Sequence, residues 1–156
     1  PNQTLLQTRN RVLLMTLAET GCLVSEVAKL RFDQWDFDRA ELEVLGKSPR
    51  RIPVSQALLA EVAELRERSP GSFLFLGFNR FGPMTATPMT PRGVEMLVKA
   101  HAEQIAGREL TPRTIRHSVV VAWARQGIEQ RRIRDLLGLK TDYAFRAYAP
   151  LLKTGD

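Results

Sequence analysis

Helix start and stop signals divide most of this chain into short helical segments. Residues 90–91 and 111–112 both read Thr-Pro, which places a capping threonine before a proline at the first helical position. A glycine follows each segment, and glycine ends helices readily because it adopts the left-handed conformation without strain. These signals predict one helix over 91–105, with a stop at Gly107, and a second helix over 112–126.

Apolar residues at near-helical spacing predict further helices on both sides of this pair. The expected segments are 4–20 with Thr4 as the cap and Gly21 as the stop, a short helix from Ser25, 55–68 capped by Ser55, 129–137 with Gly138 as the stop, and 141–148 before Pro150.

Residues 32–54 follow a two-residue period instead. Leu42 and Val44, and then 51–54, alternate in the manner of strands, and a Gly-Lys-Ser-Pro turn interrupts them. We expect a small three-stranded antiparallel sheet with a loop at 46–50, and Pro53 at a strand end or edge. The aromatic residues of this stretch are expected in the core: Phe32, Trp35 and Phe37.

Two neighbouring stretches carry less specific patterns. Residues 73–76 form a short apolar run that suits a helix or a strand, and 77–89 is rich in glycine, proline and threonine, which predicts a loop. The fold class that follows is α+β, mostly helical, with one small antiparallel sheet. Residues 1–156 are expected to form a single domain.

The basic residues of the chain are mostly arginine. The net charge is +6, and 18 of the 23 basic residues are arginine. A planar guanidinium matches phosphate oxygens in a way that a merely solvated surface does not require, which favours nucleic-acid binding. A GC-rich genome would also enrich arginine, so the charge alone leaves both explanations open.

Several classes of protein are disfavoured. No apolar run reaches the roughly 18 residues of a transmembrane helix, and no signal peptide is recognisable. The single cysteine, Cys22, cannot form an internal disulfide, so a reducing cytoplasm is the default location. His101 and His117 are too few and too far apart for a zinc site. The chain begins at Pro1, and we expect it to be part of a longer protein.

Five punctuated segments follow one another in an order that carries more information than any one of them. They are Thr-Gly-Cys-Leu-Val-Ser-Glu-Val at 20–27, Leu-Gly-Lys at 45–47 before 51–54, Leu-Thr-Pro-Arg-Thr-Ile-Arg-His-Ser at 110–118, Leu-Leu-Gly-Leu at 136–139, and Tyr148. This order and spacing resemble the tyrosine recombinase family, which includes phage integrases and bacterial Xer recombinases. The resemblance covers nearly the whole chain.

The resemblance implies a reaction on duplex DNA. In this family a tyrosine attacks a DNA phosphate, forms a 3′-phosphotyrosyl link and frees a 5′-hydroxyl, with no metal or cofactor. Negative charge gathers on the phosphate oxygens in the transition state, so fixed cations lower the barrier. The resemblance also implies site-specific recombination or DNA integration by a homo-oligomer assembled on DNA, in the cytoplasm and without a membrane. The amino-terminal DNA-clamping domain usual in the family is not expected within this chain.

Carried over by position, the resemblance assigns a role to each matching residue. Tyr148 matches the nucleophile, and Lys47 matches the loop lysine that acts as a general acid on the leaving oxygen. Arg116 matches the second arginine, which clamps the phosphate, and His117 completes the Arg-His pair. Glu26 matches the acidic residue that supports the first arginine.

Three expected active-site residues are replaced. Leu23 stands where the family has the first arginine, Arg113 where it has a histidine, and Leu139 where it has histidine or tryptophan. We hypothesise that Arg113, one helical turn before Arg116, supplies the missing guanidinium. A solvated or DNA-backbone role for Arg113 is the competing interpretation. Leu23 and Leu139 are expected to fill the core.

Several simpler interpretations stand beside this one. Tyr148 suits an ordinary helix-end tyrosine, Lys47 a solvated turn lysine, and His117 a core histidine. At the level of function, the alternatives are a catalytically silent relative that binds DNA for architecture or regulation, and a helical regulator unrelated to recombinases. Residues 130–141 also resemble the first helix and turn of a helix-turn-helix, which would bind DNA without cutting it.

Overall fold

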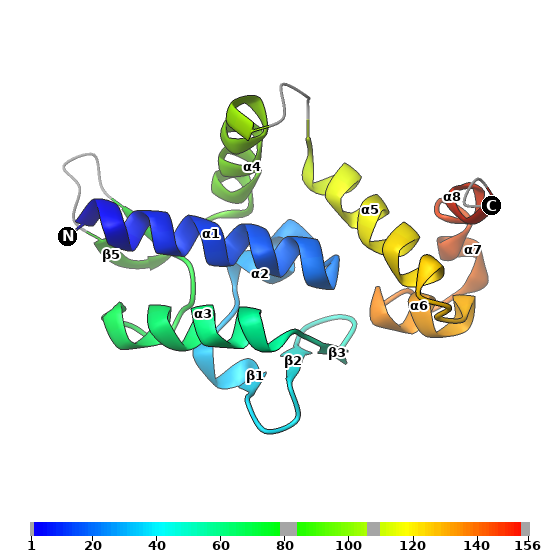
Figure 1. Ribbon diagram of the computed structural model, residues 1–156, viewed down its shortest axis with the longest axis horizontal. Coiled ribbons are helices and arrows are strands. Elements are labelled where there is room, and N and C mark those ends of the chain that lie inside the picture. Colours follow the sequence, from blue (N-terminus) through cyan, green and yellow to red (C-terminus); the bar gives the residue numbers. More distant parts are fainter. Residues whose placement is uncertain (1, 79–83, 106–109, 154–156) are drawn as a thin grey trace.

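The computed structural model describes residues 2–78, 84–105 and 110–153 (Figure 1). Its helices are α1 (Asn2–Thr20), α2 (Val24–Ala28), the 3₁₀ turn η1 (Phe32–Gln34), α3 (Gln56–Arg68), α4 (Pro91–Ile105), α5 (Pro112–Arg125), α6 (Gln130–Leu136), α7 (Asp142–Phe145) and α8 (Ala149–Lys153). Its strands are β1 (Trp35–Asp36), β2 (Glu41–Val44), β3 (Arg50–Pro53), β4 (Leu76–Phe78) and β5 (Met84–Pro88).

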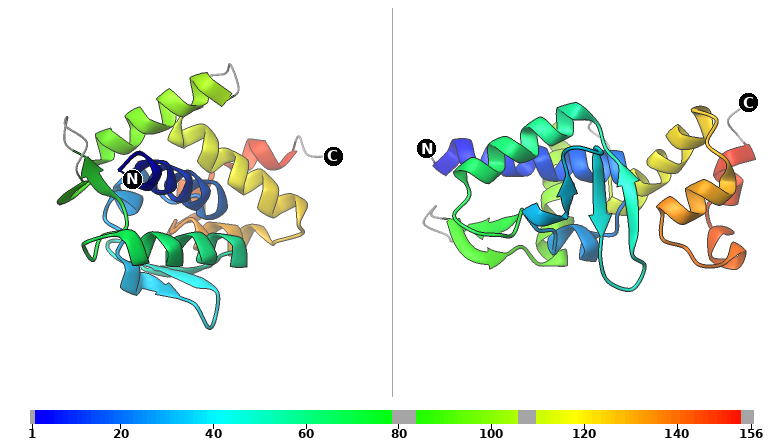
Figure 2. Two further views of the ribbon diagram at one scale, coloured as in Figure 1. Left: turned by 60° about the vertical axis from the view of Figure 1, so that its left-hand side comes forward. Right: turned by 90° about the horizontal axis from the view of Figure 1, so that it is seen from below.

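The helices pack around α1, which runs through the middle of the molecule. Helix α3 lies alongside α1, and the sheet β1-β2-β3 lies next to α3 (Figures 1 and 2). Helices α5 to α8 gather at one end of α1, where α5 contacts α1, α6 and α8. This arrangement brings the carboxyl ends of α1 and α6 toward the middle of α5.

Apolar faces of most elements meet in one core, because a helix or sheet with one apolar face must bury it against another element. The largest fully buried side chains are Phe75, Leu13, Leu17, Leu30, Leu42, Ile52, Leu58, Leu65, Leu74, Leu76, Ile133 and Val12. Capping fixes where the helices begin: the Ser55 hydroxyl accepts from the Leu58 amide, and the Thr111 hydroxyl accepts from the Thr114 amide.

The expected three-stranded sheet is confirmed. Strands β1, β2 and β3 pair antiparallel in that order, with Leu42 opposite Ile52. Pro53 is the last residue of the edge strand β3, where its missing N–H costs no ladder bond. The helices over 56–68, 91–105 and 112–125 agree with their predicted starts, while the predicted stop at Gly107 lies outside the described residues.

Residues 77–89 are not the plain loop that their composition predicts. Strand β4 pairs antiparallel with β5, and a register shift interrupts the ladder between Leu76 and Phe78. Strand β4 starts at Leu76, the fully buried last residue of the apolar run 73–76, so β5 pairs with a strand that is anchored in the core.

Three smaller expectations also need correction. Phe37 is 39% exposed, although Phe32 and Trp35 are buried as expected. Helix α1 begins at Asn2, before the expected cap at Thr4. The helix expected over 141–148 is wrong: α7 ends at Phe145, and a separate helix, α8, begins at Ala149 with Pro150 in its first turn, where the missing N–H is tolerated. Among the described helices, none is long and apolar enough to cross a membrane.

Candidate active site

Arg116 is a buried arginine whose hydrogen bonds connect three distant parts of the chain. Arg116 lies in the second turn of α5 and is 6% exposed. Its Nε donates to the phenol oxygen of Tyr148 at 2.8 Å, and its Nη2 donates to the Leu137 carbonyl at 3.0 Å. Its Nη1 donates to the Gly21 carbonyl. A guanidinium has five N–H groups, so these three bonds leave two for another acceptor.

The two carbonyls that bind Arg116 belong to helix ends. Gly21 follows α1 and Leu137 is the C-cap of α6, and both helices are stopped by a glycine in the left-handed conformation, Gly21 at φ 64° and Gly138 at φ 76°. The last carbonyls of a helix lack internal partners and carry partial negative charge, which favours a cation. The glycines that end these two helices therefore also position the carbonyl groups that bind Arg116.

Tyr148 lies between α7 and α8 and is half-buried. Its ring meets the His117 ring edge to face, with 5.3 Å between ring centroids and 84° between planes. The Phe145 ring also packs against the Tyr148 ring, tilted by 34° and with 6.0 Å between ring centroids. The phenol oxygen is held on the Arg116 guanidinium by these contacts, so the structure brings together Tyr148, Arg116 and His117.

The imidazole of His117 is biased toward its neutral form. Burial lowers the pKa of His117, and the positive charges of Arg113 and Arg116 lower it further. Arg113 itself is exposed in the first turn of α5, and it makes no hydrogen bond or ion pair to another described residue. It is thus near enough to act on His117 by charge, and its guanidinium is free of protein acceptors in the described part of the chain.

Arg50 is a buried arginine beside the candidate site that the sequence reasoning did not single out. Its Nη1 and Nη2 bind the two carboxylate oxygens of Glu26, at 2.7 Å and 2.9 Å, while its Nε donates to the Leu136 carbonyl at 2.7 Å. Glu26 was expected to support an arginine in place of Leu23, and it supports Arg50 instead. The two-residue period was the missed signal: Arg50 shares a strand face with the fully buried Ile52.

Glu26 and Arg50 form a charged pair with little solvent. Their side chains are 14% and 6% exposed. Burial favours a higher pKa for Glu26, but the Arg50 hydrogen bonds and the Leu23 amide outweigh it and lower the pKa. Burial favours a lower pKa for Arg50, and its bonds to Glu26 outweigh this and raise it. Both groups therefore stay charged.

Lys47 is exposed in the loop between β2 and β3. The next residue, Ser48, lies against Gly138: a Cβ placed on Gly138 would sit 2.9 Å from the Ser48 Cβ and 2.6 Å from the Arg50 Nη1. The loop thus abuts the carboxyl end of α6, next to the carbonyl that binds Arg116. The loop of Lys47 and the Arg116 guanidinium therefore meet the same helix end.

The three replaced positions fall in different surroundings. Leu23 is 48% exposed at the N-cap of α2, so the expectation that it fills the core is wrong. Its backbone is extended, and Glu26 accepts from its amide, so Leu23 starts α2 at the surface. Leu139 is partly buried against the core, as expected.

The helix-turn-helix interpretation of 130–141 does not fit the structure. Residues 130–136 form α6, and a turn follows, but the next helix, α7, has only four residues. At about 1.5 Å per residue such a helix is too short to read a major groove.

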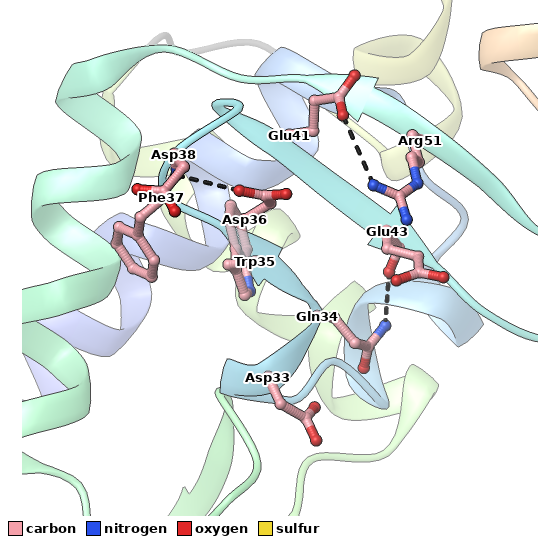
Figure 3. A pocket seen from close by; sticks show the side chains of 9 residues that line it. All are labelled: Asp33, Gln34, Trp35, Asp36, Phe37, Asp38, Glu41, Glu43 and Arg51. Atoms are coloured by element: carbon pink, nitrogen blue, oxygen red, sulfur yellow. Dashed lines mark hydrogen bonds and ion pairs between the residues drawn. The ribbon is translucent and has the colours of Figure 1, made fainter.

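A separate pocket of about 390 Å³ lies on the face of the sheet β1-β2-β3 that is opposite to the face of Arg50 and Ile52 (Figure 3). It is lined by Asp33, Gln34, Trp35, Asp36, Phe37, Asp38, Glu41, Glu43 and Arg51. Alternation along β3 points Arg51 toward this pocket, where it faces Glu41 at 3.8 Å, and Arg50 away from it. The carboxylates would repel a DNA backbone, so this face is unsuited to bind DNA.

Known proteins share both the sequence pattern and the fold. Residues 2–154 match the family described as "Phage integrase family". The tyrosine recombinase XerA of Pyrococcus furiosus is 33% identical over 135 residues, which are 83% of this chain and 46% of that protein.

Two solved structures have the same fold. The crystal structure of XerA recombinase has a TM-score of 0.80 at 20% identity, over 94% of this chain and 54% of that chain. The crystal structure of XerH bound to its difH substrate in a pre-cleavage complex has a TM-score of 0.73 at 20% identity, over 93% and 43%. The chain spans about half the length of the curated relatives it matches. With its fold and with the match over 2–154, the chain belongs to the phage integrase family of tyrosine recombinases.

Proposed function

We propose that this chain is a catalytic domain that cleaves and rejoins duplex DNA through a 3′-phosphotyrosyl intermediate. The observation that carries the proposal is the 2.8 Å hydrogen bond from the Arg116 Nε to the Tyr148 phenol oxygen. This bond places the candidate nucleophile beside a fixed cation that can also bind the phosphate under attack. The same guanidinium has two N–H groups left for a phosphate.

Each step of the proposed reaction has a group in this region. The Tyr148 oxygen bonds to phosphorus as the bond between phosphorus and the 5′ oxygen breaks. The neutral imidazole of His117, in contact with the Tyr148 ring, is suited to take the phenol proton. The ammonium of Lys47 gives a proton to the departing 5′ oxygen. Arg116 and Arg113 bind the phosphate oxygens as negative charge develops.

The substrate and assembly follow from this chemistry. Each copy holds one Tyr148, and exchange of strands between two duplexes needs several cleavages, so we propose that copies assemble on DNA. Arginine-rich exposed surface outside the acidic pocket supplies the phosphate contacts, which predicts binding that weakens steeply with salt. We place the protein in the cytoplasm, where its DNA substrate lies.

The test is covalent capture. The protein is incubated with sheared genomic DNA from its own organism, denatured, and separated from free DNA so that only covalent adducts are recovered and sequenced. The expected result is an adduct on a recurrent sequence, linked through Tyr148 and absent with Tyr148→Phe. A synthetic duplex of that sequence, nicked near the cleavage point, then traps the intermediate because the short cleaved strand diffuses away.

Two outcomes would oppose the proposal. An adduct that persists in Tyr148→Phe would assign the nucleophile elsewhere. Intact, salt-sensitive binding of DNA with no adduct on any sequence would support the catalytically silent alternative.

A further inference from the structure

Arg50 uses almost all of its hydrogen-bonding capacity within the protein. Of the five N–H groups of its guanidinium, two bind Glu26, one binds the Leu136 carbonyl and one binds the Ser48 carbonyl at 2.9 Å. Its charge is matched by the Glu26 carboxylate. Arg50 is therefore poorly suited to clamp a phosphate, although it lies beside a candidate site that lacks the first arginine.

The partners of Arg50 show what it holds together. Ser48 is in the loop after β2, Glu26 is in α2, and Leu136 ends α6. Leu136 and Leu137 offer consecutive carbonyls, the first to Arg50 and the second to Arg116. The loop that carries Lys47 is thus fixed to the same helix end as the arginine that contacts Tyr148.

The backbone at this junction leaves room for the guanidinium only because of Gly138. A Cβ there would lie 2.6 Å from the Arg50 Nη1 and 2.9 Å from its Cζ, closer than real contacts allow. The Arg50 side chain is 6% exposed and has a bidentate partner, so its geometry is restricted. Lys47, one residue before Ser48, is exposed and makes no hydrogen bond or ion pair to any residue that the structure describes.

We propose that Arg50 is a positioning residue for Lys47: it clamps the 45–49 loop onto the end of α6 so that the Lys47 ammonium is placed beside Arg116. Glu26, left without an arginine at position 23, serves this clamp instead of the phosphate-binding group. The inference rests on the proposed function, because it assigns Lys47 the task of protonating the 5′ oxygen.

A substrate with sulfur in place of the bridging 5′ oxygen separates this role from a general loss of structure. Sulfur leaves as a thiolate, which is stable without a proton, so a general acid is no longer needed. The rate of adduct formation is measured on matched nicked duplexes with 5′ oxygen and with 5′ sulfur. The ratio of the two rates does not depend on how much of a preparation is folded.

The expected results form a series. Lys47→Ala slows cleavage of the oxygen substrate by about 10²-fold or more and that of the sulfur substrate little, because a general acid contributes about 10²–10⁴-fold. Arg50→Ala moves the sulfur-to-oxygen ratio in the same direction by at least about tenfold, since displacement of a catalytic group by about 1 Å costs up to about 10²-fold. Arg50→Lys, which keeps a cation but not the fork, gives an intermediate ratio.

Arg51→Ala is the matched control. Arg51 is the next residue on the same strand, faces the acidic pocket and contacts Glu41 at 3.8 Å, so its ratio should equal that of the wild type. An unchanged ratio in both Arg50 variants, with Lys47→Ala behaving as expected, would overturn the inference and leave the proposed function intact. No adduct from the wild type on either substrate would instead refute the proposed function, and the inference with it.

Discussion

Arg116 donates a hydrogen bond from its Nε to the phenol oxygen of Tyr148, and its other two nitrogens bind the ends of two helices. The residue that contacts the candidate nucleophile is therefore also the residue that joins α1, α5 and α6. Because one side chain serves both purposes, substitutions of Arg116 should affect reactivity and stability together.

Arg116→Lys tests this double role. Lysine keeps the positive charge, but its three N–H groups radiate from a single nitrogen, so they cannot reach acceptors that are spaced for the three separate nitrogens of a guanidinium. We expect adduct formation to fall by about 10³-fold or more. We also expect unfolding free energy to fall by about 1–3 kcal/mol, because a buried carbonyl loses its donor. Adduct assays and urea denaturation measure the two effects, and wild-type stability in Arg116→Lys would contradict the joining role.

The Arg116–Tyr148 contact also predicts that cleavage occurs in cis. Both residues belong to one chain, and the phenol already lies on the guanidinium within it. A mixture of Tyr148→Phe and Arg116→Lys protomers should therefore form no more adduct than either variant alone. Recovery of adduct in the mixture would mean that one protomer delivers its tyrosine to the arginine of another.

Gly138 and Gly127 offer a matched pair for the junction at the end of α6. Both have positive φ, at 76° and 86°, so alanine costs about 1–2 kcal/mol at either position. A Cβ at Gly127 meets nothing within 4 Å, whereas one at Gly138 collides with the Arg50 guanidinium. We expect Gly138→Ala to be clearly less stable than Gly127→Ala in urea denaturation, and equal losses would remove the collision as a cause.

Much of the fold was predictable because its signals are local. Caps such as Ser55 and Thr111 and stops such as Gly21 act within a few residues, so their sequence is sufficient to mark helix boundaries. The strand β5 was missed because its pairing with β4 depends on contacts across the chain. Local composition there indicates a loop, and burial of Leu76 overrides it.

The candidate site shows the same division. Tyr148, Arg116 and His117 were predictable from motifs, and the structure brings them together. Arg50 was not, because its partner is 24 residues away on α2 and its acceptor carbonyl is 86 residues away on α6. The strand sequence does not indicate which residues bind Arg50. It indicates only that Arg50 points inward, because Arg50 lies on the same strand face as the buried Ile52.

Glu26 should make stability depend on acidity. Its pKa in the folded protein lies below the ordinary 4.5, so its contribution is present above pH 4.5 and is lost as pH falls through the lowered pKa. Glu26→Gln lacks that contribution. We expect the variant to be less stable than the wild type at neutral pH, and the gap to narrow on acidification. Thermal unfolding across this pH range measures the difference in stability, with the exposed Glu67→Gln as the control for removal of one carboxylate.

His117 should titrate below its ordinary pKa of 6.5, because burial and the charges of Arg113 and Arg116 all oppose the imidazolium. Arg113→Ala removes one of those charges and should raise the pKa of His117 toward 6.5, while Arg125→Ala, exposed at the far end of α5, should leave it unchanged. NMR titration of the ring protons gives the two pKa values, and His101→Gln assigns the two histidine signals.

The lowered pKa of His117 also affects stability. Since the folded protein binds this proton more weakly than the unfolded chain, the wild type should lose stability as pH falls below 6.5, and Arg113→Ala should lose less. If the titration midpoint of His117 is the same in Arg113→Ala as in the wild type, Arg113 points away from the His117–Tyr148 pair. Arg113 would then not belong to the group of residues that binds the phosphate.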